Sequence, residues 1–444
     1  MLSVLTNRTY GRLFAAQVIA LVGTGLATVA LGLLAFEIAG TDAGAVLGTA
    51  LAIKMVAYIG IAPVVGAYAD RLPRKTLLVA MDVVRAVVAM ALPFVDAVWQ
   101  IYLLIFLLQS ASAAFTPTFQ ATIPDILPDE EEYTTALSLS RLAYDLESLL
   151  SPILAAALLT VINFHWLFAG TSVGFVISAM LVVTSALPHR QAAKKIVESV
   201  WRKTTRGARI YLKTPRLVGL LAVTLAAAAG SAMVIVNTVV IVKGMGRSQE
   251  DVALALAAYG GGSMLAALIL PRALRSISDR SVMITGAVLL TATLSVFAMM
   301  TLGTVGMIAW PFLLGGWLVL GVAYSLSVTP GGRLLRRSSN EGDRPALFAA
   351  QFALSHVCWL LAYPVAGQIG ANSGMGVAFL ALAAMAAIGA ISALWRWPKI
   401  DPEEIAHEHP ELPSDHPHLS RQVPGEHRHA FVIDELHGRW PGRP

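Results

Sequence analysis

Apolar stretches of about 20 residues or longer fill most of the 444-residue chain, and short polar segments separate them. A stretch of that length crosses the hydrocarbon core of a bilayer as one helix, whereas barrel strands are shorter and alternate. The pattern therefore predicts an all-α membrane protein with twelve transmembrane helices, at 11–38, 44–68, 76–95, 98–122, 135–162, 164–187, 216–243, 250–270, 280–302, 306–328, 346–371 and 374–396.

A polar segment in the middle of the chain divides the twelve spans into two groups of six. Two related bundles of this kind commonly face each other around a binding site at the bilayer midplane. We expect an N-terminal six-helix bundle at 1–187, a cytoplasmic central loop at 188–215, a C-terminal six-helix bundle at 216–396 and a mostly disordered cytoplasmic tail at 397–444.

Composition agrees with a bilayer as the solvent. The chain is 56% hydrophobic and 13% charged, with a mean hydropathy of +0.69, whereas soluble domains carry about 25% charged residues. Lys and Arg gather in the loops on one side of the predicted spans, which is the cytoplasmic side by the positive-inside rule. Both termini are predicted there, and the net charge of +5 implies no nucleic-acid partner.

The loop between the second and third spans reads Gly66-Ala-Tyr-Ala-Asp70-Arg71-Leu-Pro-Arg74-Lys75. It resembles the signature loop of the major facilitator superfamily, Gly-x-x-x-Asp-Arg-x-Gly-Arg-Arg, with Pro73 in place of the second glycine. The resemblance implies two six-helix bundles in the major facilitator fold. It also implies a gating role for Gly66, Asp70, Arg71, Arg74 and Lys75, although the basic residues could instead only set topology.

A narrower resemblance covers nearly the whole chain. The segments Arg12-Leu-Phe-Ala-Ala-Gln17, Ala143-Tyr-Asp-Leu-Glu147-Ser and Gln351-Phe-Ala-Leu-Ser-His356-Val-Cys-Trp359, together with a histidine-rich tail, look like the nickel-resistance (NreB-like) exporters. This resemblance implies export of a divalent metal cation.

Charged side chains inside spans are costly and mark functional positions. Asp82 with Arg85, and Arg141 with Asp145, are three and four residues apart, so each pair is predicted to form on one helix face. Lys54 and Glu147 remain without such a partner. Two interpretations stay open: Glu147 carries the coupling proton, or it forms a static bridge with Lys54.

The fifth span is polar on one face of its helical wheel and apolar on the other, so the polar face must meet water or another helix. Span eleven adds His356, and a neutral imidazole suits Ni²⁺, Co²⁺, Zn²⁺ and Cu²⁺. A histidine bonded to a neighbouring helix is the alternative. The predicted proton and substrate pathway comprises Glu147, Asp145, Lys54, Arg141, His356 and Gln351.

Seven of the ten histidines lie in the last 38 residues, and six of them form His-x-His pairs. A flexible segment rich in proline and histidine binds transition metals without fixed geometry. We predict metal ligands in the tail at His407, His409, His416, His418, His427 and His429, against the alternative of a solvated tail with incidental histidines.

These features predict a monomeric, proton-coupled exporter of a divalent cation, Ni²⁺ first and Co²⁺ second, in a bacterial inner membrane. Proton entry would supply the work of moving charge outward, about 2.3 kcal/mol per charge per 100 mV. The sequence shows neither a Walker motif nor a nucleophile–base set, so no enzyme activity and no cofactor are expected. The alternatives are an exporter of organic molecules such as drugs or siderophores, with an aromatic cavity, and a membrane metal sensor that transports nothing.

Overall fold

The computed structural model describes residues 2–68, 73–187, 200–302, 308–340, 343–401, 404–406, 428–434 and 436–441. The helices are α1 (Arg8–Ala39), α2 (Ala43–Tyr68), α3 (Arg74–Ala91), α4 (Val98–Ile126), α5 (Glu130–Leu159), α6 (His165–Val183), α7 (Val200–Lys213), α8 (Pro215–Gly244), α9 (Gln249–Ala273), α10 (Asp279–Leu302), α11 (Trp310–Val328), α12 (Gly331–Arg337), α13 (Arg344–Ser373) and α14 (Met375–Arg396). Two short antiparallel strands follow, β1 (Glu404–Ala406) and β2 (Arg428–Ala430).

All helices except α7 and α12 correspond to the twelve predicted spans, with ends that agree to within about five residues. By length and composition, ten stretches of the described chain are candidate membrane spans; the first of them runs through both α1 and α2, and α5 lies outside this set. The sequence did not predict α7, which lies in the central loop, or α12. Each of these two is too short to cross a bilayer.

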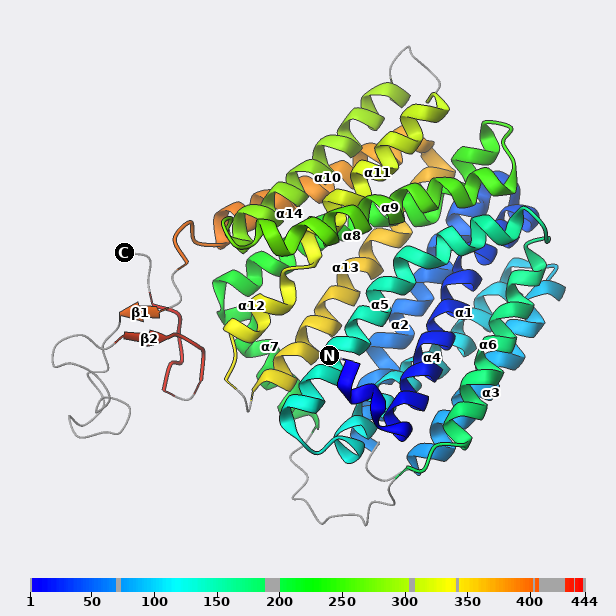
Figure 1. The fold of residues 1–444 in the computed structure, drawn as a ribbon. Coiled ribbons are helices and arrows are strands. Elements are labelled where there is room, and N and C mark those ends of the chain that lie inside the picture. Colours follow the sequence, from blue (N-terminus) through cyan, green and yellow to red (C-terminus); the bar gives the residue numbers. More distant parts are fainter. Residues whose placement is uncertain are drawn as a thin grey trace, which may run out of the picture.

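The helices form two groups in chain order (Figure 1). Helices α1–α6 contact one another and are called the first half here, and α8–α14 are called the second half. Contact between the halves runs mainly along α2 with α13 and along α5 with α9.

The closest approach of the halves is a seam of small residues where α2 begins and α13 ends. A Cβ atom on Gly48 would lie 2.6 Å from the backbone oxygen of Tyr363 and 3.1 Å from the Cα of Gly367. A Cβ atom on Gly44 would lie 2.6 Å from Oδ1 of the fully buried Asn237. Only glycine permits backbones to pack this closely, so we call Gly44, Gly48 and Gly367 the glycine seam.

A buried ion pair occupies the core of the first half. Asp82 and Arg85 pair within α3, which confirms the predicted local pairing, and Ser178 donates a hydrogen bond to Asp82 at 2.7 Å. The Arg85 guanidinium lies between the rings of Phe115 and Phe175, at 4.2 and 4.5 Å from their centroids. These contacts join α3, α4 and α6 and account for both charges structurally.

The end of the chain returns to the second half beside α7 and α12 (Figure 1). Phe431 is 3% exposed, and its backbone oxygen accepts a hydrogen bond from Arg216 at 3.3 Å. The guanidinium of Arg216 lies 4.7 Å from the centroid of the Trp440 ring, and Lys213 donates to the Gly438 carbonyl at 2.7 Å. The predicted tail therefore includes an ordered segment, residues 428–434 and 436–441, that packs on the helices.

Candidate functional site

Helix α5 presents Glu147 to α1, where a glycine leaves room for it. A Cβ atom on Gly25 would lie 2.8 Å from Oε1 of Glu147 and would overlap Ser151. One end of the same polar face contacts α1 through Ser140, which donates to Gln17 at 3.0 Å. Part of the polar face of α5 thus packs on a neighbouring helix of its own half, and Glu147 itself remains half-buried.

Lys54 of α2 is the charged partner of Glu147. The ammonium and the carboxylate interact electrostatically across the space between α2 and α5. Lys54 also lines a narrow cavity in the first half, together with Thr24 and Thr28 of α1 and Gln109 of α4. The structure therefore places Lys54 and Glu147 near enough to interact electrostatically, as the sequence suggested for two otherwise unpartnered charges.

An aromatic ring connects Lys54 to the second half. The Lys54 ammonium lies 6.0 Å from the Tyr58 ring centroid, one helical turn further along α2. Tyr58 also stacks on His356 of α13, with centroids 5.3 Å apart and planes 12° apart. Glu147, Lys54, Tyr58 and His356 form what we call the boundary cluster, which crosses from the first half to the second.

The hydrogen bonding of His356 determines which of its ring nitrogens is free to accept a hydrogen bond. Its Nδ1 lies 2.6 Å from the carbonyl oxygen of Phe352, an atom that can only accept. Nδ1 therefore carries the proton, and the neutral ring leaves Nε2 as an acceptor. The Lys54 ammonium interacts electrostatically with this ring. A neighbouring cation makes this imidazole a poor place for a second positive charge.

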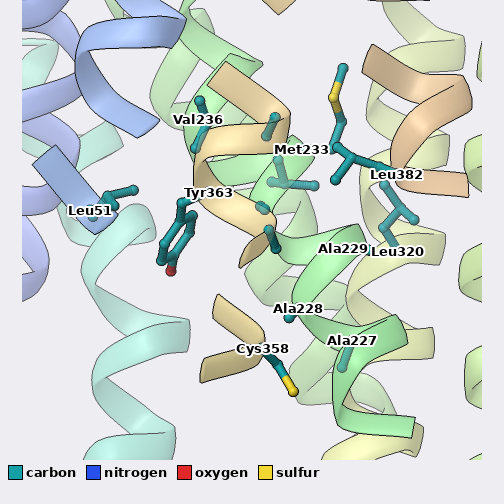
Figure 2. Close-up of a cluster of buried hydrophobic side chains, with 14 of the residues drawn as sticks. Leu51, Ala227, Ala228, Ala229, Met233, Val236, Leu320, Cys358, Tyr363 and Leu382 are labelled. Carbon is teal, nitrogen blue, oxygen red and sulfur yellow. The ribbon is translucent and has the colours of Figure 1, made fainter. Parts of the chain in front are cut away.

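Next to the boundary cluster, the second half presents a run of aromatic rings. Tyr259 of α9, Tyr324 of α11, and Trp359 and Tyr363 of α13 have successive centroids 5.9, 6.3 and 5.9 Å apart. Tyr363 faces the first half, where Leu51 of α2 lies nearby (Figure 2). We call these four residues the aromatic face. Its rings supply apolar area, and the tyrosine hydroxyls supply a few polar groups.

Gln351, predicted in the pathway, contacts α7. Its side-chain oxygen accepts a hydrogen bond from the hydroxyl of Tyr211, a fully buried ring. Burial raises the pKa of Tyr211 well above its usual value, so the hydroxyl stays protonated and donates. A salt bridge of 2.8 Å between Arg206 and Asp343 supports the same contact. The structure thus places Gln351 where α7 is attached to α13.

Several predicted residues fall outside what the structure describes. Asp70 and Arg71 of the gating loop lie outside the described residues, and so do the side chains of Arg141 and Asp145. Gly66 lies in the last part of α2.

The basic residues at the start of α3 have partners on other helices of the first half. Arg74 forms an ion pair with Asp125 at the end of α4, and Lys75 donates to the carbonyl of Ser185 after α6 at 3.0 Å. The pairing of Arg74 with Asp125 could not be predicted from the sequence, because the two residues are 51 positions apart. These two contacts tie together the ends of α3, α4 and α6.

The metal ligands predicted in the tail are largely untested by the structure. His407, His409, His416, His418 and His427 lie outside the described residues, and His429 is placed only by its backbone, paired with Ile405 between β2 and β1. In the described part of the chain, no group of three or more His, Cys, Asp or Glu residues could hold a metal ion.

Comparison with known proteins identifies the family. The family model described as Major Facilitator Superfamily matches residues 13–246 and 220–431. The chain belongs to this superfamily. Its members are transporters rather than enzymes, so this chain is a multi-pass membrane transporter and not an enzyme.

Curated relatives match only part of the chain. Macrolide efflux protein A of Streptococcus pyogenes is 26% identical over 153 residues, which are 33% of this chain and 38% of the relative. The uncharacterized MFS-type transporter YfiS of Bacillus subtilis is 27% identical over 124 residues, which are 28% of this chain and 30% of the relative. The matches therefore span only 38% and 30% of these two relatives, and cargo does not follow from them.

Solved structures share the fold over nearly the full length. The nucleoside transporter NupG superposes with a TM-score of 0.64 at 15% identity, covering 88% of this chain and 100% of that one. The D-xylose–proton symporter gives a TM-score of 0.61 at 15% identity, covering 90% and 98%. These likenesses confirm the predicted helical membrane fold.

Proposed function

We propose that this transporter is a proton-driven exporter of bulky, largely apolar organic molecules. The aromatic face carries the proposal: Tyr259, Tyr324, Trp359 and Tyr363 present neighbouring rings on the second half, beside the polar groups of the boundary cluster. Pockets that bind organic ligands combine such apolar area with a few polar groups that fix orientation. The macrolide efflux relatives are named for a large organic cargo, which supports the same class of substrate for this chain.

Coupling to protons is assigned to Glu147 and Lys54. While Glu147 is ionised, the pair is neutral; after Glu147 takes a proton, Lys54 is left as an unbalanced cation at the boundary between the halves. A change of net charge at that place alters which arrangement of the halves is favoured. We propose that the predicted units 1–187 and 216–396 rock about the boundary cluster in response.

A metal cargo, the first expectation from the sequence, has less support. His356 faces the cation Lys54, and the described residues contain no cluster that could hold a metal ion. The curated relatives whose cargo is named export macrolides rather than metals. Metal binding by the histidine-rich tail stays a prediction, and it concerns a segment separate from the aromatic face.

The proposed setting follows the positive-inside pattern. We propose a monomer in a bacterial inner membrane, with both termini in the cytoplasm, so that the glycine seam lies toward the outside. In that orientation protons enter the cell while cargo leaves it, so the two cross the membrane in opposite directions.

Uptake into inside-out membrane vesicles tests the proposal. With an acidic lumen, radiolabelled erythromycin should accumulate in vesicles that contain the protein, and a protonophore should abolish the accumulation. Replacing Trp359 by Ala should lower erythromycin accumulation severalfold. Trp395, 74% exposed on α14, is the matched control, because Trp395→Ala removes the same ring outside the aromatic face. Accumulation of Ni²⁺ but not erythromycin would reject the organic-cargo proposal in favour of a metal exporter.

A further inference from the structure

The cavity beside Lys54 contains a buried polar atom that no described group of the protein satisfies. Gln109 is 6% exposed, and its Oε1 has no hydrogen-bond partner among the described residues. Such orphaned acceptors are rare, because a buried polar atom without a partner is costly. The atom lines the same cavity as the Lys54 side chain, which carries three N–H donors.

The other polar groups of the cavity are suited to one bridging water. Thr24 and Thr28 each donate their hydroxyl hydrogen to a backbone carbonyl one turn earlier, at 2.9 and 3.0 Å, so their oxygens remain acceptors. A water molecule there can donate to Gln109 Oε1 and to a threonine oxygen while it accepts from Lys54. Those partners meet the two to four that a buried water requires, and the cavity is about the size of one or two waters.

We propose that Gln109, through this water, is a positioning residue that holds the Lys54 ammonium whenever Glu147 is protonated. This inference rests on the proposed proton coupling. In the step, Glu147 gains one proton from the aqueous phase and becomes a neutral carboxylic acid, while Lys54 keeps all three of its protons. The ammonium then loses its counter-charge, and the hydrated Gln109 oxygen replaces part of that interaction.

The groups that face Lys54 come from several helices. Among the described side chains, Glu147 approaches from α5, His356 interacts from α13 and Tyr58 lies on α2 itself. Glu147 is the only one of these that is negatively charged. A substitution of Gln109 should therefore act on transport by changing how readily Glu147 takes up a proton.

Two substitutions of Gln109 are expected to shift the pH profile of transport in opposite directions. Gln109→Leu removes the acceptor that supports Lys54 when Glu147 is neutral, so protonation becomes less favourable and the pH profile shifts to acid. The expected shift is about one pH unit, the size of a lost hydrogen bond to a charged group. Gln109→Glu adds a competing carboxylate, so Lys54 depends less on Glu147 and the profile shifts to alkaline pH.

The measurement is the midpoint pH of erythromycin accumulation by the full-length protein in proteoliposomes. Gln17→Leu is the matched control, because Gln17 is a buried glutamine of α1 that bonds Ser140 instead of lining the cavity; its midpoint should equal that of the wild type. Midpoints that do not move, or that move in the same direction in both Gln109 variants, overturn the inference. Thermal unfolding identifies a misfolded variant, and if Gln109→Leu is one, the sign of the Gln109→Glu shift decides.

Failure of this inference is distinguishable from failure of the proposed function. A wild-type protein without pH-driven erythromycin accumulation refutes the proposed function. A wild-type protein with it, but with Gln109 variants at the wild-type midpoint, refutes only the role of Gln109.

Discussion

Replacing Gly48 by alanine should make closure of the two halves along the glycine seam less favourable. The new Cβ atom would lie 2.6 Å from the Tyr363 backbone oxygen and 3.1 Å from the Cα of Gly367. Ordinary contact begins near 3.4 Å, and both neighbours are backbone atoms, so α2 and α13 must separate by roughly 0.8 Å. Overpacking of this kind costs about 1–3 kcal/mol. That energy shifts the closed–open equilibrium by roughly 5–150-fold toward opening at this end.

Thiol labelling measures that shift. Thr49 lies beside the seam, half-buried, and accepts a hydrogen bond from Gln368 at 3.1 Å. In a background with Cys358 replaced by Ala, a Thr49→Cys reporter should react with a polar maleimide at least fivefold faster when Gly48→Ala is present. Gly60→Ala is the matched control, because a Cβ atom there meets nothing within 4 Å on the same helix. Equal labelling rates in the two variants would refute the seam as the closing contact.

Three further outcomes are expected from purified protein. Arg85→Met leaves the buried Asp82 carboxylate unpaired and should cost about 3–5 kcal/mol; adding Asp82→Asn should restore most of the lost unfolding midpoint, and no restoration would argue against the ion pair. Trp440→Ala removes a cation–π contact worth about 1–2 kcal/mol, so the unfolding midpoint should fall; an unchanged midpoint would mean that the C-terminal segment does not pack there. Tyr211→Phe removes the hydrogen bond to Gln351, worth about 1 kcal/mol. Because the pKa of Tyr211 is raised, the stability that its hydroxyl contributes is complete below pH 10 and is lost only as pH rises through the raised value. If Tyr211→Phe no longer lowered the free energy of unfolding at pH 9, this reasoning would be contradicted.

The twelve long helices follow from the sequence because each apolar stretch is long enough to cross a bilayer. Helix α7 was missed because it is short and polar overall. Its buried positions Gly207, Ile210 and Tyr211 are nevertheless three and four residues apart, so an amphipathic helix was detectable in the central loop. The pairing of its Tyr211 with Gln351 was not detectable, because the two residues are 140 positions apart.

The candidate site was predictable only in part. Lys54 and Glu147 stand out because each is a charge without a partner on its own helix, and in the structure the two interact electrostatically. Tyr58 carries no such signal, since an aromatic residue in a span usually packs in the core. The sequence indicates the aromatic face only weakly. In α13, rings recur at helical spacing, at Phe352, His356, Trp359 and Tyr363. Which half that stripe faces depends on tertiary contacts.

The histidine-rich tail dominated the sequence-based expectation of a metal cargo. Composition describes what a segment binds locally, but the cargo site of a transporter is built from facing helices near the bilayer midplane. The ordered end of the tail packs on Arg216 and Lys213, outside the aromatic face.

Erythromycin transport by a Glu147→Gln variant tests the central claim most directly. In proteoliposomes, this variant should lose accumulation driven by a pH gradient and keep exchange of labelled for unlabelled erythromycin, because the halves can still move while the coupling proton has no carrier. Full gradient-driven accumulation by Glu147→Gln would contradict the account and leave Glu147 and Lys54 as a static bridge.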